Sequence, residues 1–84
     1  MSARVVMYSR PRCGLCDRAR EVIFAVAART PFQFDEVNVE GDDELELRYG
    51  LRVPVVLVDG AELFEVTVDA DLLAAAVGAR AAGR

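Results

Sequence analysis

Apolar residues in the first part of the chain form a short continuous run and then recur at helical spacing. Residues 4–8 are almost wholly apolar and are followed by Ser9 and Pro11, which is typical of a buried central strand. From residue 13 to about residue 28 the apolar pattern follows the helical period, which predicts an amphipathic helix. The positions predicted to face the core are Leu15, Ala19, Val22, Ile23 and Val26.

The middle of the chain predicts a second strand and a short helix. Residues 32–39 have the apolar pattern of a strand, although the alternation is interrupted at residues 35–36. The helix should begin after an aspartate, because a short side chain with an oxygen acceptor satisfies the first free amides of a helix. Its predicted bounds are the N-cap Asp42 or Asp43, the last residue Tyr49 and a stop at Gly50.

The last part of the chain predicts two strands and a helix. Residues 53–58 and 61–66 are the strands, and Asp59-Gly60 between them favours a tight hairpin. Asp69 suits the N-cap of the last helix. The residues of this helix predicted to face inward are Leu72, Leu73, Ala76 and Val77, with Gly78 at its end and a frayed tail from Ala79.

The predicted order of elements is β-α-β-α-β-β-α. The first β-α-β unit should be parallel, because such crossovers are right-handed and join parallel strands, whereas the hairpin strands are antiparallel. We therefore expect an α/β protein with a four-stranded mixed sheet and helices on both faces. A chain of 84 residues is short enough to form one domain over residues 1–84.

Composition and charge narrow the function classes. The net charge of −4 argues against a general electrostatic site for nucleic acid. No apolar run approaches the roughly 20 residues of a membrane span, and no leader pattern precedes the first strand. We therefore expect a cytoplasmic protein that is a monomer and binds neither nucleic acid nor membrane.

Both cysteines of the chain, Cys13 and Cys16, lie where the first strand is followed by the first helix. Residues three apart in a first helical turn are neighbours, so the pair can close into a disulfide with little backbone movement. The free amides at a helix start stabilise a thiolate, which is the reactive form of cysteine. Cys13, nearer the helix start, is therefore assigned the attack on a disulfide, and Cys16, one turn further, the resolving step.

The sequence limits what else can act on these cysteines. The chain contains no histidine, so a Cys-His pair within one chain is excluded, and two cysteines are too few for a structural zinc site. Arg10 and Arg12 are the nearest positive groups and favour the thiolate of Cys13. Arg20, by contrast, we expect to be a solvated surface charge.

The stretch Tyr8-Ser9-x-Pro11-x-Cys13-x-x-Cys16 resembles the active-site signature of the glutaredoxins. With Leu15 and Asp17 it is most similar to small bacterial glutaredoxin-like proteins whose site reads Cys-x-Leu-Cys-Asp. The resemblance covers nearly the whole chain and implies the thioredoxin fold in its minimal form. It also implies that Cys13 is the nucleophile and Cys16 the resolving cysteine. The substrate-binding residues that we expect around them are Tyr8, Arg10, Arg12, Arg52, Val53 and Pro54.

Three of these positions follow the resemblance closely. Arg10 stands where many glutaredoxins have a lysine that contacts glutathione. Val53 and Pro54 stand where thioredoxin-fold proteins have a cis peptide bond that faces the cysteines, which leaves the backbone before the proline free to pair with a substrate. Arg52 adds a positive group that either binds a substrate carboxylate or points to water.

The sequence also departs from the glutaredoxins. Gly14-Leu15 separates the cysteines in place of the usual Pro-Tyr, so the redox potential of those proteins does not carry over. The glycine pair that admits the γ-glutamyl end of glutathione is absent, and Val66-Thr67-Val68 lie near its place. We expect no tightly bound cofactor, and glutathione or another low-molecular-weight thiol as exchange partner.

The function predicted from these residues is thiol–disulfide oxidoreduction by a Cys-x-x-Cys dithiol, with protein disulfides or a small thiol as substrate. Two other functions use the same residues. One is a redox-sensing adaptor, and the other is a dimer in which four thiolates from two chains hold an iron–sulfur cluster.

Overall fold

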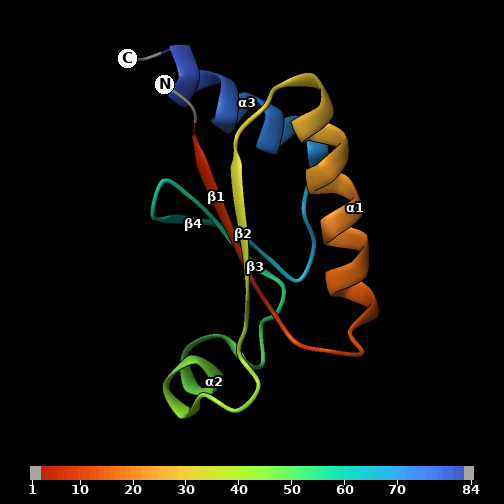
Figure 1. Cartoon of the computed structure of the whole chain (residues 1–84), viewed down its shortest axis with the longest axis vertical. Coiled ribbons are helices and arrows are strands. Elements are labelled where there is room, and N and C mark those ends of the chain that lie inside the picture. Colours follow the sequence, from red (N-terminus) through yellow and green to blue (C-terminus); the bar gives the residue numbers. More distant parts are fainter. Residues whose placement is uncertain (1–2, 83–84) are drawn as a thin grey trace.

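The computed structural model describes residues 3–82 of the chain. Seven elements follow one another in the predicted order (Figure 1). They are β1 (Arg4–Ser9), α1 (Gly14–Arg29), β2 (Gln33–Asn38), α2 (Asp43–Tyr49), β3 (Val55–Val58), β4 (Ala61–Glu65) and α3 (Ala70–Ala82).

The four strands form one mixed sheet in the order β2-β1-β3-β4. β1 runs parallel to β2, with Tyr8 opposite Val37, and antiparallel to β3. β3 and β4 form the predicted hairpin, whose turn residues Asp59 and Gly60 have φ of 50° and 87°. Positive φ at both turn positions matches the right-handed twist of the strands that the turn joins. The predicted architecture is therefore confirmed.

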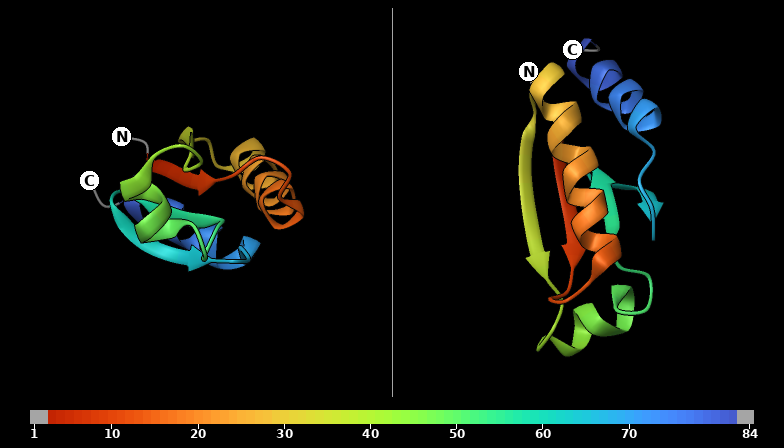
Figure 2. Two further views of the ribbon diagram at one scale, coloured as in Figure 1. Left: turned by 90° about the horizontal axis from the view of Figure 1, so that it is seen from below. Right: turned by 90° about the vertical axis from the view of Figure 1, so that its right-hand side faces the viewer.

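The main core lies on the face of the sheet that α1 and α3 cover (Figure 2, right). Alternate residues of β1 and β3 point to this face, and the helices add an apolar stripe each. The fully buried side chains include Val5, Met7, Val56, Val58, Ile23, Leu73 and Val77. Each contributes about 1.5–3 kcal/mol to folding, so this face holds α1 in place above the sheet.

The opposite face carries a smaller cluster built around Val39, Tyr49 and Val55. α2 has 7 residues and packs only near the end of the sheet where β1 and β2 finish (Figure 1). Val6 and Tyr8 are consequently half-buried, and β1 alternates between buried and partly exposed residues. The expectation of a fully buried first strand was therefore wrong, although the strand is central.

Two predicted inward leucines lie outside the core. Leu15 is 42% exposed and Leu72 is 61% exposed. In α1 the buried positions begin with Cys16 and continue through Ala19, Ile23 and Val26. The core stripe of α1 thus includes the second cysteine, and Leu15 is turned away from it by about 100° because successive helix residues differ by that angle.

Helix α3 begins as predicted, since the Asp69 carboxylate accepts a hydrogen bond from the Leu72 amide at 3.0 Å. It does not end at Gly78 but continues to Ala82. The prediction of a frayed tail from Ala79 was therefore wrong for residues 79–82, which are helical. Residues 83–84 lie outside the described part of the chain. A glycine stops a helix through a left-handed backbone, and the described residues with positive φ do not include Gly78.

Candidate active site

Cys13 is the N-cap of α1. Its backbone is extended, with φ of −120°, and its Sγ accepts a hydrogen bond from the Cys16 amide at 3.1 Å. The preceding residue, Arg12, has φ of 55°, a left-handed conformation that turns the chain from the end of β1 into the helix. The sulfur therefore meets one of the free amides of the first turn, which is the contact that stabilises a thiolate. Cys13 is partly exposed.

Cys16 lies one turn further, with 0% of its surface exposed. Burial raises the pKa of its thiol to about 11, and a hydrogen bond with the Cys13 side chain acts in the same direction. The Arg10 amide and the charge of Arg20 oppose this shift. Both cysteines are free in this structure. Cys16 is therefore a protonated thiol near neutral pH and becomes reactive only after it loses that proton.

The raised pKa predicts a pH-dependent stability of the reduced protein. The folded state holds the Cys16 proton more strongly than the unfolded chain does, so its contribution is complete below pH 9 and lost as the pH rises towards 11. Urea unfolding under reducing conditions should show a steeper fall in the free energy of unfolding for the wild type than for Cys16→Ala in this window. Parallel curves for the two proteins would contradict the prediction.

Arg10, one of the predicted substrate-binding residues, is placed against α2. Its Nη2 lies 2.5 Å from Glu46 Oε1 and donates to the Gly50 carbonyl at 2.9 Å, while Nη1 lies 3.3 Å from Glu46 Oε2. The hydrogen bond with Glu46 raises the pKa of Arg10, and the charge of Cys13 adds a smaller effect in the same direction. Arg10 thus joins the cysteine loop to α2 and remains within electrostatic reach of the nucleophile.

Arg12 is placed differently. Its side chain is 80% exposed, and its Nη2 lies 3.5 Å from Glu40 Oε2. An exposed ion pair of this kind contributes little to stability. Arg12 is therefore the predicted substrate-binding arginine that is most easily redirected to a ligand beside Cys13.

Tyr8 and Arg52 lie on the α2 side of the sheet. The Tyr8 ring stacks on that of Tyr49, with centroids 4.1 Å apart and planes 15° apart. The Arg52 guanidinium lies 5.6 Å from the centroid of the Tyr49 ring. Arg52 Nη1 also donates hydrogen bonds of 2.9 Å to Oε1 of Glu62 and to Oε1 of Glu65. The two residues are thus grouped around Tyr49, and the partly exposed Arg52 side chain is paired with carboxylates of the protein itself.

The peptide bond between Val53 and Pro54 is cis, the isomer that the resemblance implies. The residues before and after Val53 are both hydrogen-bonded to Val66. The Val66 amide donates to the Arg52 carbonyl at 3.3 Å and to the Pro54 carbonyl at 2.9 Å. Within residues 3–82 the backbone amide and carbonyl of Val53 form no hydrogen bond. The segment is therefore anchored through its neighbours, and Val53 keeps free backbone groups.

A polar network next to Cys16 was missed by the sequence analysis. Arg20, expected to be solvated, donates through Nε to Glu36 Oε1 at 2.8 Å and through Nη1 to Asp17 Oδ1 at 2.9 Å. The buried Ser9 hydroxyl donates to Glu36 Oε2 at 2.7 Å. The pKa of Glu36 is lowered, chiefly by Arg20. The interruption of the strand pattern at residues 35–36 was the signal of this network, because an acidic residue on the helix-covered face needs a partner.

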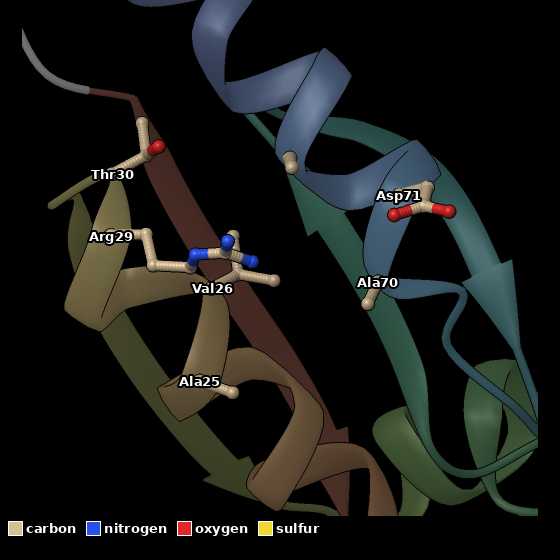
Figure 3. A pocket seen from close by; sticks show the side chains of 7 residues that line it. Ala25, Val26, Arg29, Thr30, Ala70 and Asp71 are labelled. Atoms are coloured by element: carbon tan, nitrogen blue, oxygen red, sulfur yellow. The ribbon is translucent and has the colours of Figure 1, made fainter.

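Three of the surface hollows formed by residues 3–82 lie at different places along α1. One adjoins the cysteine loop and is polar, with Ser9, Arg10, Asp17 and Glu36 among its walls. A second lies between the first turns of α1 and the segment after β4. The third lies at the opposite end of α1, where Figure 3 shows Arg29 on α1 and Asp71 on α3 on opposite walls. The first two therefore belong to the neighbourhood of the cysteines, and the third does not.

Residues 3–82 contain no group of three or more side chains that could hold a metal ion. None of the helices in this part is both long enough and apolar enough to cross a membrane.

Comparison with known proteins identifies the family of this chain. The sequence model of the glutaredoxin-like domain (DUF836) matches residues 4–78. The chain belongs to this glutaredoxin-like family. A curated relative, the glutaredoxin-like protein YDR286C homolog of Dictyostelium discoideum, is 28% identical in an alignment 78 positions long that covers 86% of this chain and 72% of that protein.

Solved structures agree with this assignment. Protein XcR50 of X. campestris is 38% identical, with a TM-score of 0.76 over 89% of this chain and 96% of that chain. A mutant thioredoxin of Halobacterium salinarum is 25% identical, with a TM-score of 0.64 over 93% of this chain and 74% of that chain. The glutaredoxin-like protein therefore has the thioredoxin fold, and its family supports a general role in thiol redox chemistry.

Proposed function

We propose that this glutaredoxin-like protein is a thiol–disulfide oxidoreductase in which Cys13 is the nucleophile and Cys16 the resolving cysteine. The observation that carries the proposal is the asymmetry of the pair. At the start of α1, the Cys13 Sγ accepts a hydrogen bond from the Cys16 amide at 3.1 Å. Cys16, by contrast, is fully buried, and the pKa of its thiol is raised to about 11. Cys13 is therefore suited to attack a disulfide as a thiolate, and Cys16 stays protonated until the second exchange.

The reaction proceeds in two exchanges. The Cys13 thiolate attacks one sulfur of a substrate disulfide, forming a mixed disulfide and releasing the other substrate sulfur as a thiolate. That thiolate takes up the Cys16 proton, directly or through water. The Cys16 thiolate then attacks the Cys13 sulfur, which breaks the mixed disulfide and releases the second substrate sulfur as a thiolate. The products are the reduced substrate and a Cys13–Cys16 disulfide, so two electrons pass from the protein to the substrate.

The substrate is held by the free backbone groups of Val53, which can pair with an extended segment as a neighbouring strand would. Two moles of glutathione or another low-molecular-weight thiol return the protein to its dithiol form and leave as the oxidised disulfide. The exposed Arg12 side chain is the group that we assign to a carboxylate of this thiol. A cycle that needs a supply of reduced thiol suits a monomeric protein of the cytoplasm.

The proposal is tested by equilibrating the protein in buffers of graded glutathione and glutathione disulfide, trapping with acid and reading the intact mass. The expected result is a loss of two hydrogen masses in a single reversible transition, with a glutathione adduct on Cys13 as a minor species. If the dithiol remains unoxidised across the whole series, the proposal is wrong.

A further inference from the structure

Helix α2 carries apolar residues on two opposite sides, and the fold uses only one of these sides. Leu45 and Tyr49 are four residues apart and belong to the smaller cluster that packs against the sheet. Leu47 and Leu51 are also four residues apart, but they are two positions out of step with the first pair. Two positions turn a helix by about 200°, so the second pair lies on the side away from the sheet.

Leu47 and Leu51 are the two most exposed large apolar residues in the described part of the chain, at 88% and 101%. Gly50, which stands between them, keeps helical angles, with φ of −54° and ψ of −37°. Leu51 therefore lies about one turn beyond Leu47, and the two side chains form one leucine strip on the surface. Adjacent apolar side chains that the fold leaves in water indicate a surface that another molecule covers.

The leucine strip is acidic at one end. Asp43 and Glu44 precede Leu47 by four and three positions, which places them on the same side of the helix. Both residues are exposed, and neither carboxylate has an ion-pair or hydrogen-bond partner within the described part of the chain. The Arg48 guanidinium lies 5.7 Å from the centroid of the Tyr49 ring, a residue of the sheet-facing pair. The negative charges beside the strip are therefore left without a partner.

These features select the chemistry of the molecule that covers the strip. Two leucines one turn apart fit apolar side chains with the same spacing on another helix. Unpaired carboxylates at one end favour a partner with basic side chains at the matching place, and they repel an acidic one. The same charges disfavour the anionic surface of a membrane or a nucleic acid. The strip is therefore complementary to an amphipathic helix with basic residues beside its apolar face.

The leucine strip is held in a fixed relation to the cysteine loop. Arg10, three residues before Cys13, donates to the Gly50 carbonyl at 2.9 Å and pairs with Glu46. Helix α2 lies at the end of the sheet where β1 finishes, and α3 lies at the other end (Figure 1; Figure 2, right). A partner on the strip is therefore placed at the same end of the protein as Cys13.

We propose that the leucine strip, together with Asp43 and Glu44, is a docking surface for a partner protein that presents an amphipathic helix with basic side chains beside its apolar face. This surface contains neither cysteine, so the inference goes beyond the proposed function. Docking should be equally strong for the wild type and for Cys13→Ser.

The test uses the reduced full-length protein and a fluorescent peptide of about 18 residues, a length at which a helix can form without a partner. The peptide carries leucines on one face and lysines beside them. Two matched peptides replace either the lysines by glutamates or the leucines by serines. Fluorescence anisotropy should show binding that weakens as salt is raised, with an affinity about tenfold lower for each matched peptide. Amide NMR shifts should change at residues 43–51.

Two double variants identify the surface. Leu47→Ser combined with Leu51→Ser should lower the affinity for the leucine and lysine peptide about tenfold, because that factor needs only partial burial of the two side chains. The urea midpoint should be unchanged, since both side chains are exposed. Asp43→Asn combined with Glu44→Gln should remove most of the salt dependence of binding.

The matched control is Asp71→Asn combined with Leu72→Ser. These residues are an exposed acid and a 61% exposed leucine on α3, at the other end of the protein, and their replacement should leave the affinity unchanged. If the control loses as much affinity as the leucine variant, the proposal is wrong.

The remaining outcomes separate this proposal from its alternatives. Absence of binding, or equal binding of the lysine and glutamate peptides, overturns the docking surface. A wild-type dimer in sedimentation that is lost in the leucine variant assigns the strip to a second copy of the chain and also overturns it. A dithiol that never oxidises, in a protein that still binds the peptide, overturns the proposed function alone.

Discussion

Cys13→Ser is expected to abolish reduction of a small disulfide such as 2-hydroxyethyl disulfide, leaving the rate of the uncatalysed reaction. The serine hydroxyl is similar in size to the thiol and can accept the same hydrogen bond from the Cys16 amide. A hydroxyl, however, does not ionise in the pH range where a thiol does. The loss is therefore chemical and not structural. It is measured by steady-state kinetics with a thiol reductant, together with urea unfolding to show that the fold remains.

Cys16→Ser tests the second role. With no resolving thiol, the mixed disulfide on Cys13 should accumulate to nearly one equivalent, and intact mass should show the substrate thiol bound to the protein. Retained dithiol turnover in Cys13→Ser, or an adduct on Cys16 in the wild type, would contradict the assignment of roles. A mixed disulfide that disappears in Cys16→Ser as fast as in the wild type would contradict the resolving step.

Gly50→Ala is expected to reduce the free energy of unfolding by about 1–3 kcal/mol, the usual cost of overfilling a packed site. A Cβ at this buried position would lie 2.5 Å from the Glu46 carbonyl and 2.9 Å from Arg10 Nη2, and it would also meet the Glu46 carboxylate. The side chain that must move is the one that joins the cysteine loop to α2. Urea unfolding should show a lower midpoint with an unchanged m-value.

Two further variants define the cause of this loss. Gly78→Ala lies inside α3, where a Cβ would meet nothing within 4 Å, so it should stabilise the protein by about 0.5–1 kcal/mol. Arg10→Ala combined with Gly50→Ala should cost less than the sum of the single changes, because both act on the same contact. Additive losses would show that Arg10 is not the group displaced.

Gly50 also illustrates how a sequence pattern can identify the right residue for the wrong reason. The helix does end at Tyr49, but Gly50 has φ of −54° and ψ of −37°, so the end does not depend on a left-handed glycine. The absence of a side chain is needed there because Arg10 and Glu46 pack against the backbone. Those residues are far from each other in sequence, and no local pattern relates them.

Most of the fold was predictable because it depends on local chemistry. The apolar patterns that predicted each strand and helix, the Asp59-Gly60 turn and the aspartate N-caps each act over a few neighbouring positions, and the structure confirms the elements that they predicted. The exact inward face of a helix was less predictable. Leu15 and Cys16 are adjacent and both suited to burial, and only the packing of α1 on the sheet places Cys16 inside.

The order of the elements and the position of the two cysteines at the start of a helix can be predicted from the amino-acid sequence, because hydrophobic periodicity and helix-end chemistry depend on short stretches of chain. The surroundings of the cysteines depend instead on how the elements pack together. Arg10 is paired with Glu46, Arg20 with Glu36, and Leu15 faces Val66 across a groove. These contacts join residues that are distant in sequence, and they exist because the packed sheet and helices bring those residues within a few ångströms of one another.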